Sequence, residues 1–262
     1  MARRVADARV LLTAMLDRGH VAHDQIRQAL DASANNAGAL KGARIGVARA
    51  YCGYHDELDE VFEQALQRLA KAGATLVDPV LVASTEDMRV HERLLMAYEF
   101  KAGLNAYLQT RDQRTKVRSL DQLIAFNKAH ADTVMPYFPQ DILETAAACG
   151  PLTEAGYLEA RELCQSKARG TIDAAHKDHG LDAIAAPTAS PAWRIDWVCG
   201  DNRKGGASAP AAIAGYPHVT VPMGQVQGLP VGMSLFSTAM RDAHVVALAA
   251  AFEDITRANE TE

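Results

Sequence analysis

The segment Gly205-Gly206-Ala207-Ser208 combines residue types that could bind a ligand. Two glycines before a serine at the start of a helix can present a hydroxyl together with free backbone N–H groups. The same spacing is explained if Ser208 only caps a short helix expected at 208–214, with Pro210 in its first turn. Helix capping by Ser208 is therefore the preferred interpretation, and a capping helix whose amino end also lines a ligand pocket is the alternative.

A loop rich in proline, tryptophan and glycine over residues 187–206 holds the second group of candidates. It follows an apolar strand expected at 182–186, and ligands in open α/β sheets bind beyond the carboxyl ends of strands. This placement favours a pocket wall whose candidate residues are Trp193, Trp197, Asp201 and Asn202. The alternative is a rigid surface loop whose tryptophans cover the core.

Two pairs of histidines have spacings that a metal site could use. His176 and His179 are separated as on one helix face, but they come just before Gly180, at an expected helix end. Positive side chains are favourable there, so a structural cap is the preferred interpretation. His20 and His23 flank a loop and receive the same interpretation. The chain has no G-x-S-x-G, H-E-x-x-H, phosphate-loop or dinucleotide fingerprint, so we expect no cofactor and no metal.

Composition excludes several classes of protein. The 262 residues are 48% hydrophobic and 23% charged, which is ordinary for a globular protein and excludes a disordered chain. The net charge of −5 argues against a nucleic-acid surface, which needs clustered basic residues. No apolar run approaches the ~18–20 residues of a membrane span.

The four cysteines have no C-x-x-C spacing, which argues against a zinc site or a disulfide framework. We expect them to be reduced and mostly buried thiols of a cytoplasmic protein; they are Cys52, Cys149, Cys164 and Cys199.

The first half of the chain predicts a crossover unit. Residues 43–48 form an apolar strand, 57–72 an amphipathic helix and 75–77 a second strand, which implies parallel pairing. Gly73 fits the position just past the helix, where a positive φ is favourable. Two short helices precede this unit at 5–15 and 23–32, with a loop over 33–38 between them and the first strand.

Residues 84–177 are expected to form a mainly helical insertion. Helices are predicted near 87–108, 120–130, 141–149 and 153–177, with buried faces that include Tyr98, Phe100, Leu104 and Tyr107. Strands follow at 182–186, 219–221 and 231–235, and an amphipathic helix at 243–255 closes the chain. The fold class is therefore α/β, as one domain with a helical insertion.

Taken together, these segments resemble the carboxyl-terminal half of the amidase signature family of hydrolases. The matching segments run in the family's order: MARRVAD (1–7), LKGARIGV (40–47), AGATLVD (72–78), YEFK (98–101), LNAYL (104–108), LDAIAAPT (181–188), SAPAAIAGYP (208–217), VTVP (219–222), GLPVG (228–232) and AFE (251–253). Each segment alone is weak, but their order over residues 1–257 is specific. The YEFK and Gly-Asp-Asn-like stretches resemble peptide-amide and general amidases.

The resemblance implies amide hydrolysis by a Lys, a cis-Ser and a nucleophilic Ser from the family's amino-terminal half, around a Gly-Gly-Ser-Ser-Gly-Gly stretch. These 262 residues contain no such stretch. The Gly-Gly-Ala-Ser segment aligns instead with a later helix that lines the pocket, so no catalytic residue carries over. The family's carboxyl half mainly shapes the substrate cleft within a mixed β-sheet flanked by helices. Thr188, at a strand end, thereby joins Trp193, Trp197, Asp201, Asn202 and Ser208 as a candidate substrate-binding residue.

We therefore expect the carboxyl-terminal portion of an amidase-type hydrolase, inactive alone. It would comprise one partial α/β domain over 1–257 and a tail at 258–262. The alternative is a non-catalytic remnant, or a binding subunit of a split amidase. The expected partners are a small-molecule amide, an amino-terminal amidase half and further copies of the chain; neither nucleic acid nor a membrane is expected.

Overall fold

The fold is built on one mixed sheet of five strands. The computed structural model describes residues 1–36, 38–83, 86, 88–112 and 114–260. The strands lie in the order β2-β1-β3-β5-β4. β1 pairs in parallel with β2 and β3, while β5 pairs antiparallel with β3 and β4. Their bounds are Arg44–Val47 (β1), Thr75–Val77 (β2), Ala183–Pro187 (β3), His218–Val226 (β4) and Leu229–Phe236 (β5). The expected α/β class with a mixed sheet is confirmed.

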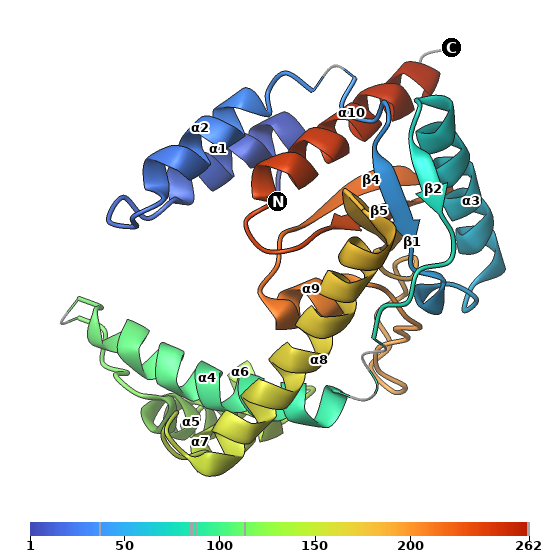
Figure 1. Ribbon diagram of the computed structural model, residues 1–262. Coiled ribbons are helices and arrows are strands. Elements are labelled where there is room, and N and C mark those ends of the chain that lie inside the picture. The colour runs from blue at the N-terminus through green and yellow to red at the C-terminus, as the bar shows by residue number, and fades with distance from the viewer. Residues whose placement is uncertain (37, 84–85, 87, 113, 261–262) are drawn as a thin grey trace. The chain divides into compact units, whose positions relative to one another are not determined.

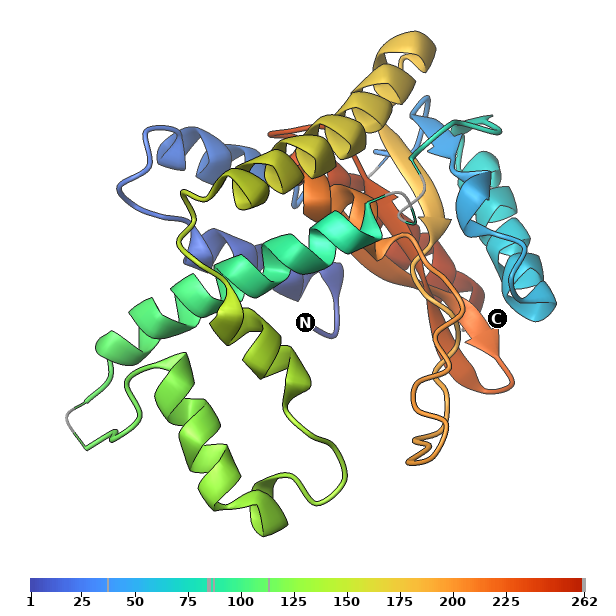
Figure 2. The same ribbon diagram turned by 90° about the horizontal axis from the view of Figure 1, so that it is seen from below.

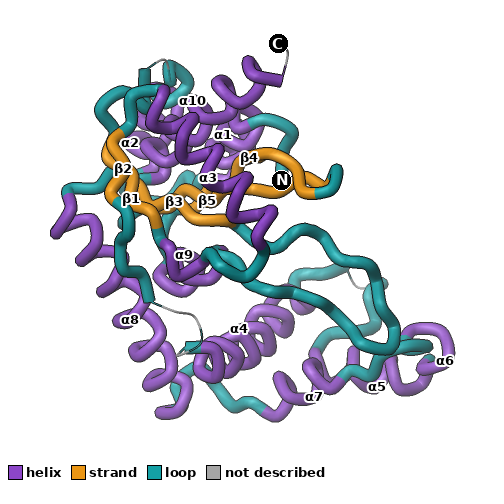
Figure 3. The backbone as a smooth tube through the Cα atoms, turned by 90° about the vertical axis from the view of Figure 1, so that its right-hand side faces the viewer, coloured by secondary structure: helices purple, strands orange, loops and turns teal. Residues whose placement is uncertain are grey.

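Helices cover both faces of the sheet (Figures 1 and 3). One face carries α1 (Val5–Met15), α2 (His23–Ala32), α3 (Asp56–Lys71) and α10 (Asp242–Glu260). The other carries α9 (Ser208–Ala214) and the part of α8 (Ala155–His179) from residue 167 onward. β3 is buried throughout and β1 is buried except at Arg44, as the continuous apolar runs predict for strands covered on both faces.

The crossover unit forms as its sequence predicts. α3 begins one residue earlier than expected, with the His55 imidazole accepting a hydrogen bond from the Leu58 N–H at its first turn. Phe62, Leu66 and neighbouring apolar residues of α3 join the main core beneath the sheet. Gly73 then takes a φ of 96°, which reverses the chain into β2. A single 3₁₀ turn (η1, Arg49–Tyr51) leads from β1 toward α3.

Residues 85–166 form a second compact unit that is helical throughout its regular structure. It contains α4 (Arg89–Gln109), α5 (Leu120–Ala129), α6 (Ala131–Val134), α7 (Asp141–Ala148) and the first part of α8. The predicted start of α4 at Asp87 lies outside the described residues, as do residue 84 and residue 37 of the loop at 33–38. A small core joins Leu120 and Ile124 of α5 to Ala146 of α7.

The prediction of which α4 residues are buried is only partly correct. Leu104 packs against the small core, but Phe100 is 42% exposed and Tyr107 is 54% exposed. Tyr98 is half-buried, and its hydroxyl donates a hydrogen bond to Glu154. The core of this unit is too small to cover a whole apolar face of a 21-residue helix, and none of the residues of α4 is fully buried.

The expectation of mostly buried cysteines is wrong. All four are free thiols, as predicted, but of these only Cys164 is buried. Cys52 and Cys149 are half-buried and Cys199 is exposed, because it lies in the loop after β3 rather than on a covered face. Within the described part of the chain, no helix is both long and apolar enough to cross a membrane.

A buried carboxylate on α10 anchors the start of α1. Both oxygens of Glu253 lie 3.2 Å from the Val5 N–H, and Arg4 lies 3.7 Å from the same carboxylate. No side chain at the N-cap position of α1 binds the free N–H groups of its first turn. The carboxylate therefore acts as a cap supplied from a distant part of the chain, and its charge suits the positive end of the helix.

Replacing Glu253 by alanine is expected to destabilise the protein by about 1–3 kcal/mol, because the Val5 N–H would lose its buried acceptor. Asp254→Ala is the matched control. Asp254 reaches Arg4 at 3.6 Å with a half-exposed side chain, and such a pair contributes at most about 1 kcal/mol. Urea unfolding and amide exchange along α1 measure both effects. Equal losses in the two variants would contradict an anchoring role for Glu253.

Candidate functional site

Three hydroxyl groups and one imidazole form a chain of hydrogen bonds across β3, β5 and β4. Thr188 is the first residue after β3, and its Oγ1 lies 2.7 Å from Oγ1 of Thr220 on β4. Ser234 of β5 donates a hydrogen bond to Thr188 Oγ1 at 2.9 Å. The Ser234 hydroxyl also lies 2.8 Å from Nε2 of His218, at the start of β4. The cluster therefore joins three strands at the end of the sheet where ligands bind in α/β proteins.

Gly232 makes this cluster possible. It lies on β5 between the two threonines, and its carbonyl accepts the Thr188 N–H at 2.8 Å. A Cβ at this position would lie 2.6 Å from Thr220 Oγ1 and 3.3 Å from Thr188 Oγ1. A glycine thus lets two side chains from β3 and β4 meet over the strand that separates them.

The Ser234–His218 pair has the composition of a nucleophile and its base, but it is closed to substrate. Ser234 is fully buried. Burial also lowers the pKa of His218, because the charged imidazolium is poorly solvated there, so the ring is neutral at pH 7. A neutral imidazole holds the orientation of the hydroxyls without adding charge. The cluster can position a polar group of a ligand at Thr220, which is exposed.

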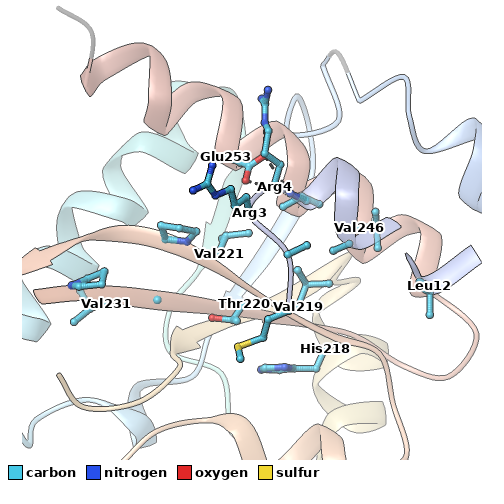
Figure 4. Close-up of a pocket in the computed structure, with 17 residues that line it drawn as sticks. Arg3, Arg4, Leu12, His218, Val219, Thr220, Val221, Val231, Val246 and Glu253 are labelled. Carbon is cyan, nitrogen blue, oxygen red and sulfur yellow. Dashed lines mark hydrogen bonds and ion pairs between the residues drawn. The ribbon is translucent and has the colours of Figure 1, made fainter. Parts of the chain in front are cut away.

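A pocket of about 710 Å³ runs along the outer edge of β4 (Figure 4). Its walls come from the first residues of the chain, α1, β4, β5 and α10, and most of its lining is apolar. His218 and Thr220 open into it from one side of the strand, whereas Arg3, Arg4 and Glu253 lie on the other side in Figure 4. The hydroxyl cluster therefore ends in a mostly apolar pocket, the arrangement that ligand and partner sites commonly have.

Four of the predicted site residues lie in the loop after β3, and none of them lines this pocket. The loop extends beyond the sheet in Figure 2. The indole N–H of Trp193 donates a hydrogen bond to Asp201 at 3.1 Å, which ties the two arms of the loop together. Trp197 is 56% exposed, and both Asp201 and Asn202 are exposed. The two tryptophans do not cover the main core, because neither joins its cluster of packed residues.

Gly206, at the base of the loop, allows the backbone to pass close to Thr188. A Cβ on Gly206, whose φ is 135°, would lie 2.3 Å from the Thr188 carbonyl oxygen. The following N–H, of Ala207, is bound by the carbonyls of Pro187 and Thr188, at 3.1 Å each. This N–H is therefore not free for a ligand, and the segment holds the loop against the end of β3.

The capping role expected of Ser208 is wrong. α9 spans 208–214 as predicted, but its N-cap is Ala207, and no side chain caps it. The Ser208 hydroxyl instead accepts a hydrogen bond from Arg203 at 3.2 Å. Because Ser208 already belongs to the first turn, its hydroxyl is directed toward the loop rather than toward the N–H groups of α9.

Within the described ranges, neither histidine pair belongs to a group of three or more His, Cys, Asp or Glu side chains that could hold a metal ion. His176 is buried, with Nδ1 2.9 Å from the Ile172 carbonyl and Nε2 3.0 Å from the Ser237 hydroxyl. Burial lowers its pKa, so it is a neutral core residue rather than the charged cap expected from the sequence. His23 contacts Asp24 on the surface.

His218, Thr220 and Ser234 are not among the site residues predicted from the sequence. Residues 219–221 and 231–235 are predicted there only as short apolar strands, without a polar face. The signal was the alternation of polar and apolar residues along 218–221, since a period of two puts His218 and Thr220 on one face. The meeting of that face with Thr188 depends on the strand order, which the sequence does not contain.

A family model described as Amidase matches residues 1–246. The chain belongs to this amidase family. The expected resemblance to the amidase signature family is thereby confirmed.

Among solved structures, the chain is similar to native peptide amidase from Stenotrophomonas maltophilia, with 37% identity and a TM-score of 0.83. It is also similar to a peptide amidase in complex with the competitive inhibitor chymostatin, with 38% identity and a TM-score of 0.86. Both matches cover 98% of this chain and 53% of the other.

Among curated proteins, the chain is 26% identical to a Glutamyl-tRNA(Gln) amidotransferase subunit from Pseudomonas syringae pv. syringae (strain B728a). That match covers 98% of this chain and 54% of the Pseudomonas protein. A probable amidase of Arabidopsis thaliana is also 26% identical, over 83% of this chain and 39% of its own length. The chain therefore spans about half the length, or less, of the relatives it matches.

Proposed function

We propose that this chain is the carboxyl-terminal portion of an amidase-type hydrolase that cleaves amide C–N bonds. In this proposal it shapes the substrate cleft, and the Lys, cis-Ser and Ser of the reaction come from an amino-terminal half. Two observations support the division of roles: the 262 residues contain no Gly-Gly-Ser-Ser-Gly-Gly stretch, and the relatives are about twice as long.

The main structural support for the proposal is the edge of the sheet at β4. β4 is the last strand in the order of the described sheet, so its outer backbone groups have no neighbouring strand. The apolar pocket of about 710 Å³ runs along this edge. Unpaired strand edges and apolar surface favour association with another segment of protein. An amino-terminal half seated here would place its own residues beside the Thr220 hydroxyl.

The substrate in this proposal is a small-molecule amide, and the similarity to peptide amidases favours the amide of a peptide. Thr188 would act through Thr220, whose hydroxyl reaches the pocket. The remaining predicted residues would form the outer wall of the cleft; they are Trp193, Trp197, Asp201, Asn202 and Ser208. We further propose that residues 1–257 act as one amidase-like α/β domain with a helical insertion.

Co-expression tests the proposal. The chain is produced with the amino-terminal half of Stenotrophomonas maltophilia peptide amidase, which supplies the part of the fold that the match leaves out. We expect a complex that co-purifies and slows amide exchange along β4. The control is that peptide amidase itself, divided at the same boundary and reassembled from its own halves. Reassembly of the control without binding by this chain would contradict the proposal and favour a non-catalytic remnant.

A further inference from the structure

A groove between α4 and α7 lies entirely within the helical unit. Residues of α4 spaced i, i+3, i+4 and i+7 line one side, and residues of α7 spaced i, i+3 and i+4 line the other. Such spacing places each set on a single face of its helix. The groove encloses about 590 Å³; its lining is Arg93, Met96, Ala97, Phe100, Ile142, Thr145 and Ala146.

Small residues form the floor of the groove and large apolar residues form its rims. Ala146 is buried, and Ala97 packs against the small core beneath. Met96 is 55% exposed, Phe100 42% and Ile142 77%. Exposed apolar side chains around a hollow of this size are typical of binding sites, since leaving them in water is unfavourable.

The lining of the groove contains one positively charged side chain, Arg93. Arg93 is exposed and forms neither a hydrogen bond nor an ion pair with any residue that the structure describes. Two carboxylates of α4 and α7 have other partners. Glu99 accepts a hydrogen bond from Tyr157, and Glu144 pairs with Lys128 at 2.8 Å. The groove thus combines an apolar surface with an uncompensated guanidinium group.

We propose that this groove binds a small amphipathic carboxylate, with its apolar tail between Met96, Phe100 and Ile142 and its carboxylate on Arg93. A guanidinium group can bind a carboxylate through two parallel hydrogen bonds. The α4 stripe from Arg93 to Phe100 is about 10 Å long at 1.5 Å per residue, or two helical turns. That length suits a medium-chain alkyl tail better than a docked helix, whose anchors extend over further turns.

Calorimetric titration of the full chain tests this site, with decanoate below its micellar concentration as the probe. We expect one site that binds decanoate more tightly than 1-decanol, which has the same tail without the charge. Arg93→Gln should weaken decanoate binding about tenfold by removing the charge-assisted pair. Arg89→Gln is the matched control, because Arg89 lies on the same helix but is paired with Glu86 outside the groove.

A larger side chain at the floor of the groove gives a second, independent test. Ala97→Leu should abolish decanoate binding and leave urea unfolding unchanged or slightly more resistant, because the added methyl groups enter empty space. Decanoate binding that survives both Arg93→Gln and Ala97→Leu would overturn the proposal. Absence of binding to the unmodified chain would also overturn it. So would protection of α4 in the complex with an amino-terminal half, since a segment of protein would then occupy the groove. None of these outcomes depends on amidase activity.

Discussion

Purified on its own, the chain is expected to hydrolyse neither peptide amides nor simple esters above the rate in buffer. Enzymes lower reaction barriers by roughly 8–23 kcal/mol, and most of that reduction requires a positioned nucleophile, a base and oxyanion donors. Two serine–histidine pairs occur among the described residues, His218 with Ser234 and His176 with Ser237. Both serines are fully buried, so neither can reach a substrate. Release of ammonia from a peptide amide measures the result.

Binding of an amino-terminal half is expected to raise the rate of hydrolysis at least about 10⁶-fold, the lower end of enzymatic acceleration. Ser208→Ala in the isolated chain is the control, because Ser208 has no nucleophilic role in the proposed mechanism. Turnover by the isolated chain that Ser208→Ala removes would contradict the prediction and make Ser208 the nucleophile. Turnover that the variant retains would still show that catalytic groups lie within these 262 residues.

The isolated chain is also expected to self-associate at micromolar concentrations and to bind a hydrophobic dye. The pocket along β4 leaves apolar side chains in contact with water, and the strand has no neighbour on its outer side. Pairing should involve residues 218–221. Beyond them Pro222 has no N–H, and the ladder is irregular between Pro222 and Gly224. Sedimentation velocity over a concentration series measures the association.

Two lysine substitutions distinguish association through the pocket along β4 from association through another part of the surface. Pro230→Lys places a charge at an exposed position in the pocket and should shift the chain toward monomer. Val21→Lys places a charge on an exposed apolar residue outside the pocket, so it should leave association unchanged. A stable monomer at high concentration that binds no dye would mean that the chain closes its own core. The docking of an amino-terminal half along β4 would then lose its physical basis.

Much of the local structure was determined by the sequence alone. The continuous apolar runs predicted that β1 and β3 are strands covered on both faces, because a strand with one face in water alternates polar and apolar residues. The helical period and Gly73 placed α3 and the turn into β2 within a residue or so. The order of the segments that resemble the amidase signature family likewise indicated the family, which the match over residues 1–246 shows.

The tertiary structure alone decided how residues far apart in the chain meet. Thr188, Thr220 and Ser234 form one cluster only because β5 lies between β3 and β4 and carries a glycine where the threonines cross. Glu253 caps a helix that begins at Val5, at the opposite end of the chain. Patterns of period 2 or 3.6 report which face of an element is covered, but not which element covers it. The same limit explains why Phe100 was expected to be buried but is exposed. The pattern along α4 does not show how small the core beside that helix is.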